Sequence, residues 1–310
     1  MDGYIKELTN IISNGSMENT YKMSWIRSIV ETCEKQPKKT IHFDELSPLI
    51  FKYYWNQSIF FNLQQGPSIK RKPKIQQLVE KQIRKYKSKH GTQPKTFIKV
   101  KDKIKIPVQQ ISTVLTLDVS WRFLIVGKDK FNIYECDKEK RTIRILKPEL
   151  IKEYSDILYQ LINYRWTQKL EDIDGSPRIS KKVRGVDREK TPKRKNLKPF
   201  HKFLDYENPS KKCFITGDKI PELEITVDHV IPWSYMYSDD LWNLVYVQSG
   251  LNSSKNNRLP NEEMVDKLEK RNRRLLKLLK KNNIQNKHVG ELGISIKNNY
   301  VRHHWTGFRG

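Results

Sequence analysis

Apolar residues recur with the periodicity of an α-helix in three stretches near the start of the chain, residues 17–33, 43–63 and 68–90. Residues three and four positions apart lie on one face of a helix, so each stretch is predicted to pack through one face. The apolar positions are Met23, Ile26, Ile29 and Val30; Phe43, Leu46, Leu49, Ile50, Tyr53 and Tyr54; and Ile75, Leu78, Val79 and Ile83. The pattern predicts a mainly helical N-terminal region whose aromatic side chains form core rather than a base-stacking platform.

A small β element is predicted to interrupt this helical region. Residues 98–107 alternate between apolar side chains and lysines, which is the period of a strand or an extended arm. Residues 121–146 predict two or three further short strands with turns between them. Residues 147–170 return to helical spacing, with Pro148 near the first turn of the expected helix.

Apolar residues become sparse from Asp174 to about Lys198. Residues 177–198 hold ten Lys or Arg and two acids, a composition typical of a cationic linker. We therefore predict an α-rich basic domain over residues 1–172, a linker over residues 173–199 and a second domain over residues 200–310.

The second domain begins with two predicted strands. Residues 222–232 and 243–247 have strand character, and the connector between them is loop-like. Residues 249–258 suit the start of a helix, and residues 261–284 predict an amphipathic basic helix. The fold class predicted for the whole chain is therefore α+β.

The charge of the chain narrows its function classes. Sixty Lys and Arg against 35 Asp and Glu give 310 residues a formal net charge of +25. A globular protein this basic usually binds a polyanion, most often nucleic acid; the alternative is that lysine merely covers the surface. Between Lys70 and Lys89 there are nine Lys or Arg and one acid, Glu80, which indicates either a phosphate-contacting helix or a solvated one. The candidate nucleic-acid contacts are Lys70, Arg71, Lys72, Lys74, Arg84, Lys182, Arg184 and Arg194.

The cysteines and the apolar stretches exclude other classes. Three scattered cysteines, Cys33, Cys136 and Cys213, do not form the pattern of a disulfide framework or of a self-contained zinc knuckle. The start of the sequence lacks a basic segment followed by an apolar run, and no window approaches 18 uninterrupted apolar residues. We expect a cytoplasmic protein without a membrane partner.

Candidate chemistry is concentrated between Val227 and Pro260. Asp228 and His229 close the first predicted strand, Asn243 opens the second, and Asn252 falls in the first turns of the helix that follows. An Asp carboxylate and an Asn amide supply hard oxygen ligands for Mg²⁺, and a neutral His beside the metal can accept a proton from water. The alternatives are an exposed turn pair for Asp228 and His229, and a helix N-cap for Asn252.

The words "DHVIPWS", "NLV" and "NSSKNNRLP" resemble the motif of HNH endonucleases, which form a ββα-metal finger. The distances fit as well, with 14 residues from His229 to Asn243 and 23 from His229 to Asn252. The resemblance covers roughly residues 213–260. It implies that His229 is the general base and that Asn243 holds the loop and the histidine in place through backbone hydrogen bonds. It also implies that Asp228 and Asn252 bind one Mg²⁺ (or Mn²⁺).

Lys255 and Asn256 are weaker candidates within the same resemblance, either for contact with a phosphate or as a shifted metal ligand. The chain departs from family members that brace the finger with zinc bound by two pairs of cysteines. Thr216, Gln248 and Leu251 stand at three of those four positions, so structural zinc is not expected. The finger would be held by packing of Phe214, Ile225, Val227, Trp242, Leu244 and Tyr246.

The resemblance and the charge together predict a helical N-terminal DNA-binding domain, followed by an HNH finger and a basic helix. The expected activity is metal-dependent hydrolysis of DNA phosphodiester bonds, in a restriction or phage-defence role. One finger cuts one strand, so a double-strand break would need a homodimer, a partner nuclease or defence subunit, or two successive events. The alternatives are an RNA- or structure-directed nuclease, and a DNA-binding module with a non-catalytic finger.

Overall fold

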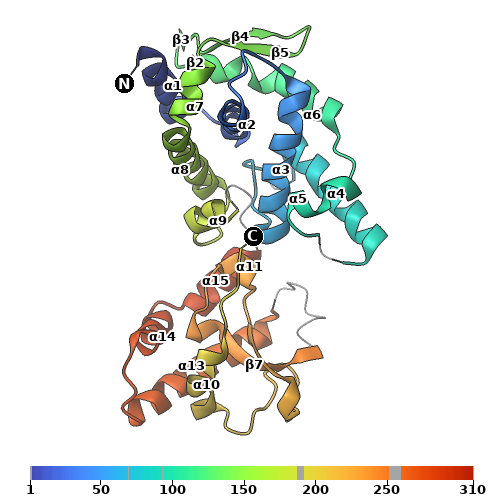
Figure 1. Ribbon diagram of the computed structural model, residues 1–310. Coiled ribbons are helices and arrows are strands. Elements are labelled where there is room, and N and C mark those ends of the chain that lie inside the picture. Colours follow the sequence, from blue (N-terminus) through green and yellow to red (C-terminus); the bar gives the residue numbers. More distant parts are fainter. Residues whose placement is uncertain (1, 69, 93, 187–191, 251–259, 310) are drawn as a thin grey trace. The chain divides into compact units, whose positions relative to one another are not determined.

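The computed structural model describes residues 2–68, 70–92, 94–186, 192–250 and 260–309 (Figure 1). The chain forms two compact units. Unit 1 contains Met1–Asp174 and Ile179–Pro192, and unit 2 contains Gly175–Arg178 and Lys193–Gly310. None of the helices in the described ranges combines the length and the apolar character that spanning a bilayer requires.

Unit 1 is built around α2 (Tyr21–Lys35), which lies between α3 and α8 (Figure 1). Ten of its 15 residues are buried, including Trp25, whose indole N–H donates to the Tyr134 hydroxyl at 2.9 Å. A helix buried on all sides belongs to the centre of a core. The other α-helices in the described part of unit 1 are α1 (Gly3–Asn14), α3 (Phe43–Phe61), α4 (Lys74–His90), α5 (Phe97–Val100), α6 (Val108–Val114), α7 (Pro148–Glu153), α8 (Ser155–Ile173) and α9 (Ile179–Gly185). The three N-terminal helices predicted from apolar spacing are confirmed as α2, α3 and α4.

The β element of unit 1 consists of two small antiparallel sheets. β4 (Tyr134–Asp137) pairs with β5 (Thr142–Ile145), which pairs on its other side with β1 (Thr40–His42). β2 (Ile125–Val126) and β3 (Asp129–Lys130) form a separate hairpin whose turn contains Gly127 at a φ of +60°. Short strands within residues 121–146 are therefore confirmed, although there are four of them rather than two or three.

The prediction of a strand at residues 98–107 is wrong. Phe97–Val100 form α5 and Lys101–Lys103 form a 3₁₀ turn. Phe97 and Val100, three residues apart, are buried, and the Phe97 ring lies edge-on to Phe51 at 6.0 Å, whereas Ile98 is 52% exposed. The residues that pack therefore have helical spacing, and the alternation of lysine with isoleucine does not correspond to two faces of a strand.

The predicted linker is partly folded. α9 lies inside it and belongs to unit 1, where Ile179, Lys182 and Val183 are buried. These positions are spaced three and four apart, which is the buried stripe of a short helix. The stripe is not apparent from the sequence because lysines stand between Ile179 and Val183, and because its third residue, Lys182, is itself a lysine.

Unit 2 contains a hairpin of two strands surrounded by helices. β6 (Ile225–His229) pairs antiparallel with β7 (Leu244–Gln248), so the two predicted strands are confirmed. The connector between them, residues 230–243, contains the helical turn α11 (Trp233–Met236), whereas the sequence pattern predicts only a loop. The other α-helices in the described part of unit 2 are α10 (His201–Glu207), α13 (Glu262–Lys281), α14 (Lys287–Lys297) and α15 (Tyr300–Arg309).

The predicted basic helix near the C-terminus is confirmed as α13. Asn261 caps it by accepting a hydrogen bond from the Met264 N–H at 2.9 Å, and Glu262 and Glu263 occupy its first turn. Acids are favoured there because the N-terminal end of a helix carries partial positive charge. Its apolar seam packs into one core together with β6, β7 and α14; the seam residues buried in that core are Val265, Leu268, Leu275 and Leu279.

Candidate functional site

The candidate site lies where β6 ends. Asp228 and His229 are the last two residues of the strand and face Val245 and Leu244 of β7. Both are buried, with exposed fractions of 9% for Asp228 and 3% for His229. The alternative of an exposed turn pair is therefore wrong. Burial of a carboxylate and an imidazole is costly unless they are paired, so their partners are informative.

The side chain of Asn243, at the end of the connector, forms hydrogen bonds with the backbone at its beginning. Its side-chain Oδ1 accepts from the Ile231 N–H at 2.8 Å, and its Nδ2 donates to the Ile231 carbonyl at 2.9 Å. Its own carbonyl accepts from the Val230 N–H at 2.9 Å. These are backbone hydrogen bonds of the kind expected for Asn243, and they fix the chain directly after His229.

The structure also brings in Asp239, a residue that the sequence pattern did not single out. Asp239 Oδ1 lies 3.0 Å from His229 Nε2, on the opposite side of the ring from Asp228, whose Oδ1 lies 4.0 Å from Nδ1. One ring nitrogen is thus within hydrogen-bonding distance of the Asp239 carboxylate, whereas the Asp228 carboxylate lies near the other nitrogen but beyond hydrogen-bonding distance. An ionised carboxylate only accepts hydrogen bonds, so this contact favours the tautomer with a proton on Nε2.

The remaining candidates for the metal and the phosphate, Asn252, Lys255 and Asn256, lie outside the described residues. Among the residues that are described, no group of three or more His, Cys, Asp or Glu side chains is arranged to hold a metal ion. A site formed by the Asp228 carboxylate and an asparagine amide would not contain three such side chains. The carboxylate of Asp228 is of the hard-oxygen type that Mg²⁺ prefers.

Cys213 sits where the hairpin packs against the preceding loop. Its thiol is buried, which raises its pKa, but backbone N–H groups of Thr216, Gln248 and Ile215 together outweigh burial, so the pKa lies below its ordinary value. The Phe214 N–H donates to the Tyr246 carbonyl at 2.9 Å. The expected packing is confirmed: Phe214, Trp242, Leu244 and Tyr246 are buried in the core of unit 2, with Ile225 and Val227 partly buried against it.

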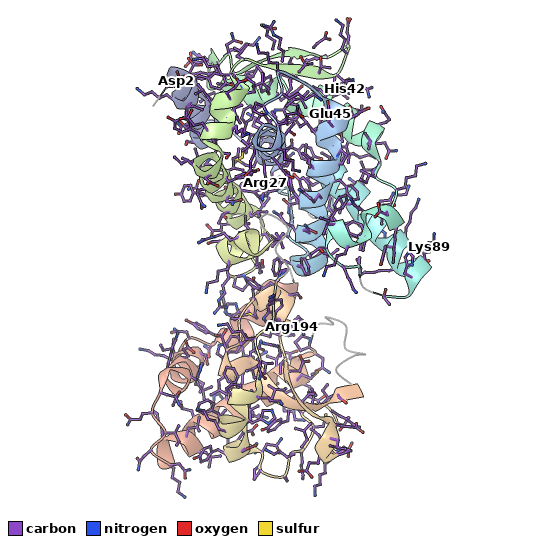
Figure 2. The ribbon with its side chains drawn as sticks, in the orientation of Figure 1. Asp2, Arg27, His42, Glu45, Lys89 and Arg194 are labelled. Atoms are coloured by element: carbon purple, nitrogen blue, oxygen red, sulfur yellow. The ribbon has the colours of Figure 1, made fainter. Side chains whose placement is uncertain are left out.

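Most candidate contacts for nucleic acid are at the surface. Lys70, Arg71, Lys74, Arg84, Arg184 and Arg194 are exposed or partly exposed. Lys72 is half-buried and forms an ion pair with Glu80 at 2.7 Å. Lys89, in the last turn of α4, projects away from the neighbouring helices (Figure 2). α4 therefore presents a basic outer face.

Lys182 must be removed from the set of nucleic-acid contacts. Its side chain is fully buried, because α9 places it three residues after the buried Ile179 and next to the buried Val183. A side chain enclosed in the core of unit 1 does not reach a phosphate. Arg194 is exposed, and its guanidinium lies over the ring of Trp233 at 5.2 Å.

The matches to known proteins agree with the geometry of the hairpin. A model of the family described as "HNH endonuclease" matches residues 213–261. This range contains β6, the connector and β7, and it supports a nuclease acting on nucleic acid. No curated protein and no solved structure matches the chain.

Proposed function

We propose that the chain is a divalent-metal-dependent HNH endonuclease that hydrolyses DNA phosphodiester bonds. The observation that carries the proposal is the placement of His229 at the end of β6, with Asp239 on Nε2 and Asp228 near Nδ1. It supports a general base because the Asp239 carboxylate orients the ring through Nε2, while Nδ1 lies beside Asp228, the proposed metal ligand. The family match over residues 213–261 supports the same interpretation.

In the proposed reaction, His229 moves one proton. With a proton on Nε2 donated to Asp239, Nδ1 carries the lone pair of the neutral ring. Nδ1 takes a proton from a water molecule, and the water oxygen attacks the phosphorus as the bond to the 3′-oxygen breaks. The leaving oxygen is protonated from solvent, so the products carry a 5′-phosphate and a 3′-hydroxyl. Asp239 stabilises the imidazolium that forms.

Asp228 and Asn252 are proposed to hold Mg²⁺ or Mn²⁺, with Lys255 and Asn256 as candidates for contact with the phosphate. When bound, the ion would supply positive charge for the phosphate and the leaving oxygen. The side chain of Asp228 is 12% exposed and that of His229 only 2%. The substrate is therefore proposed to approach from the side of Asp228. No role for structural zinc is proposed.

DNA is proposed as the substrate because the net charge of +25 and the basic outer face of α4 favour a nucleic-acid backbone. Cleavage of both strands would use a homodimer or a partner nuclease. A restriction or phage-defence role in the cytoplasm is the biological setting that we propose, from the habits of stand-alone HNH proteins.

The proposal is tested by incubating the protein with supercoiled plasmid, single-stranded DNA and RNA, each with Mg²⁺, with Mn²⁺ or with EDTA. We expect metal-dependent nicking of the plasmid and loss of nicking in His229→Ala. His303→Ala is the matched control, because His303 is an exposed histidine of the same unit. Plasmid that stays supercoiled with both metals would contradict a DNA nuclease.

The same experiment separates the alternatives. Cleavage of RNA alone would move the substrate to RNA. Binding of DNA without cleavage of any substrate would favour a non-catalytic finger. If His229→Ala nicks as fast as the parent protein, the assigned general base is wrong.

A further inference from the structure

The connector that carries Asp239 is gripped by an arginine from a distant part of the sequence. Arg178 Nη1 donates to the Met236 carbonyl at 3.2 Å, and Nη2 donates to Asp240 Oδ2 at 3.3 Å. All three residues belong to unit 2. Since Met236 precedes Asp239 and Asp240 follows it, one guanidinium holds the connector on both sides of the residue that contacts His229.

Asp240 is held in place by further hydrogen bonds. Its Oδ2 also accepts from the Ser238 hydroxyl at 2.5 Å, and its carbonyl accepts from the Asn243 N–H at 2.9 Å. Asp240 therefore links Arg178 to the same asparagine that closes the connector. The ion pair with Arg178 is largely shielded from water, since the side chains are 31% exposed for Arg178 and 17% for Asp240.

The backbone between the two anchor points is in an unfavourable conformation. Tyr237 ends α11 with a φ of +49°, a region that residues with a Cβ rarely adopt. Such a residue keeps its conformation only where the surrounding contacts hold it, and strain of this kind gathers at functional sites. The turn at Tyr237 directs Ser238 and Asp239 back towards β6, and the bonds of Arg178 lie on either side of it.

Two further contacts tie the connector to the segments that lead to unit 1 along the chain. The Tyr235 hydroxyl donates to the Gly175 carbonyl at 3.5 Å, and the Arg194 guanidinium lies over the Trp233 ring. Gly175–Arg178 and the residues from Lys193 are the parts of unit 2 next to unit 1 in sequence. Both joining segments therefore end on the connector.

We propose that Arg178 is a positioning residue for His229, acting through Asp239. By fixing Met236 and Asp240, Arg178 keeps Asp239 Oδ1 within hydrogen-bonding distance of Nε2, and the orientation of the ring follows. Arg178 does not touch the imidazole. The catalytic consequence rests on the proposed nuclease function, whereas the structural consequence, the hydrogen bond of His229, does not.

The structural part is tested by NMR of the imidazole N–H of His229 in protein labelled with ¹⁵N-histidine, without any substrate. We expect a hydrogen-bonded Nε2–H signal in the parent protein, its loss by exchange in Arg178→Ala, and partial recovery in Arg178→Lys. Arg302→Ala is the control: Arg302 also bridges acids of unit 2, among them Glu262 at 3.2 Å, and should leave the signal unchanged. A signal that persists in Arg178→Ala, or that is missing from the parent, overturns the proposal.

The catalytic part is tested with a double-mutant cycle on single-turnover nicking. Because an error of about 1 Å in positioning can cost on the order of 100-fold, we expect Arg178→Ala to lower the rate between about 10- and 100-fold with little change in DNA affinity. In an Asp239→Asn background the same change should cost less than about 3-fold, because residues that act through one another are not additive. Equal reductions in both backgrounds would show that Arg178 acts elsewhere. If the parent protein cuts nothing, the proposed function fails and the NMR result alone decides the positioning role.

Discussion

Asn243 grips both polar groups of one residue, accepting from the Ile231 N–H at 2.8 Å and donating to the Ile231 carbonyl at 2.9 Å. The pair is buried, so neither group of Ile231 has water as a substitute. The two hydrogen bonds join Ile231, two residues after His229, to Asn243, the residue directly before β7. The two ends of the connector are thereby hydrogen-bonded to each other, so the connector forms a closed loop.

Asn243→Ala should therefore open the connector. Two buried backbone groups would be left unsatisfied, at about 1–3 kcal/mol each. We expect unit 2 to lose on the order of 2–6 kcal/mol of stability and the Ile231 amide to exchange much faster with D₂O. Asn282→Ala is the control, because Asn282 is an exposed asparagine at the end of α13. Unchanged protection of the Ile231 amide would contradict the role given to Asn243.

Asp239→Asn should slow cleavage by on the order of 100-fold or more at saturating DNA. The amide oxygen of the asparagine can still accept from Nε2–H, but the amide lacks the negative charge that stabilises a protonated ring. If the amide turns its NH₂ group to Nε2, the proton of the ring moves to Nδ1 and the general base is lost. Single-turnover nicking and DNA affinity should be measured together, since only the rate is expected to fall. Asp218→Asn, at an exposed aspartate of the same unit, is the matched control. A rate within about 2-fold of the parent would remove Asp239 from the mechanism.

Neutralising the outer face of α4 together with two basic residues just before the helix should weaken binding to DNA and flatten its salt dependence. The change is Lys70, Arg71, Lys74 and Arg84 to Gln, which leaves the ion pair of Lys72 intact. The slope of log K against log[salt] should become less steep by about 0.9 for each phosphate of duplex DNA that the variant no longer neutralises. The control replaces four exposed lysines of the same unit, Lys6, Lys128, Lys130 and Lys152, with the same change in net charge. Equal effects of the two sets would show general attraction rather than a binding face.

The acid stability of unit 1 should depend on Glu31. Burial alone raises its pKa, but the charge of Lys52 and hydrogen bonds from Lys35, Lys52 and Tyr53 outweigh burial and lower the pKa to about 2, from an ordinary value of 4.5. Because the folded pKa is the lower one, the stabilisation is complete above about pH 4.5 and is lost as the pH falls towards 2. The shift corresponds to about 3 kcal/mol.

Glu31→Gln should remove this part of the pH dependence. The unfolding free energy of unit 1, measured by denaturation between pH 5 and pH 2, should fall less steeply in the variant than in the parent protein. Glu153→Gln, at an exposed glutamate of α7, should keep the parental slope. Parallel curves for the parent and Glu31→Gln would mean that the ion pair of Glu31 with Lys52 contributes nothing.

Two features of the sequence predicted the structure correctly: the helical spacing of apolar residues, and a motif of several polar residues within a short segment. α2, α3, α4 and α13 follow from apolar spacing, and Asp228, His229 and Asn243 follow from types and distances along a hairpin. The errors have physical causes. At residues 98–107 the burial of Phe97 and Val100 favours a helix, and the alternation of lysine with apolar residues has no structural meaning. Lys182 lies on the buried face of α9, a helix so short and so highly charged that its buried face cannot be identified from sequence.

Asp239 and Arg178 were missed for a different reason. Their contacts with the site depend on the course of the connector, which includes a positive φ at Tyr237 and which no sequence pattern predicts. Two adjacent acids, Asp239 and Asp240, in so basic a chain were the available signal. Even so, only the folded connector shows that one acid faces His229 and the other Arg178.

The order of the units along the chain has a practical outcome. The polypeptide enters unit 2 at Gly175, leaves it after Arg178 and returns at Lys193. No single cut can separate the two units with all their parts. A fragment begun at residue 200, where composition places the start of the second domain, or at residue 193, where unit 2 resumes, leaves Arg178 behind with the other half. Such a fragment would lack the hydrogen bonds of Arg178 to Met236 and Asp240, so its inactivity would not test the proposed nuclease function.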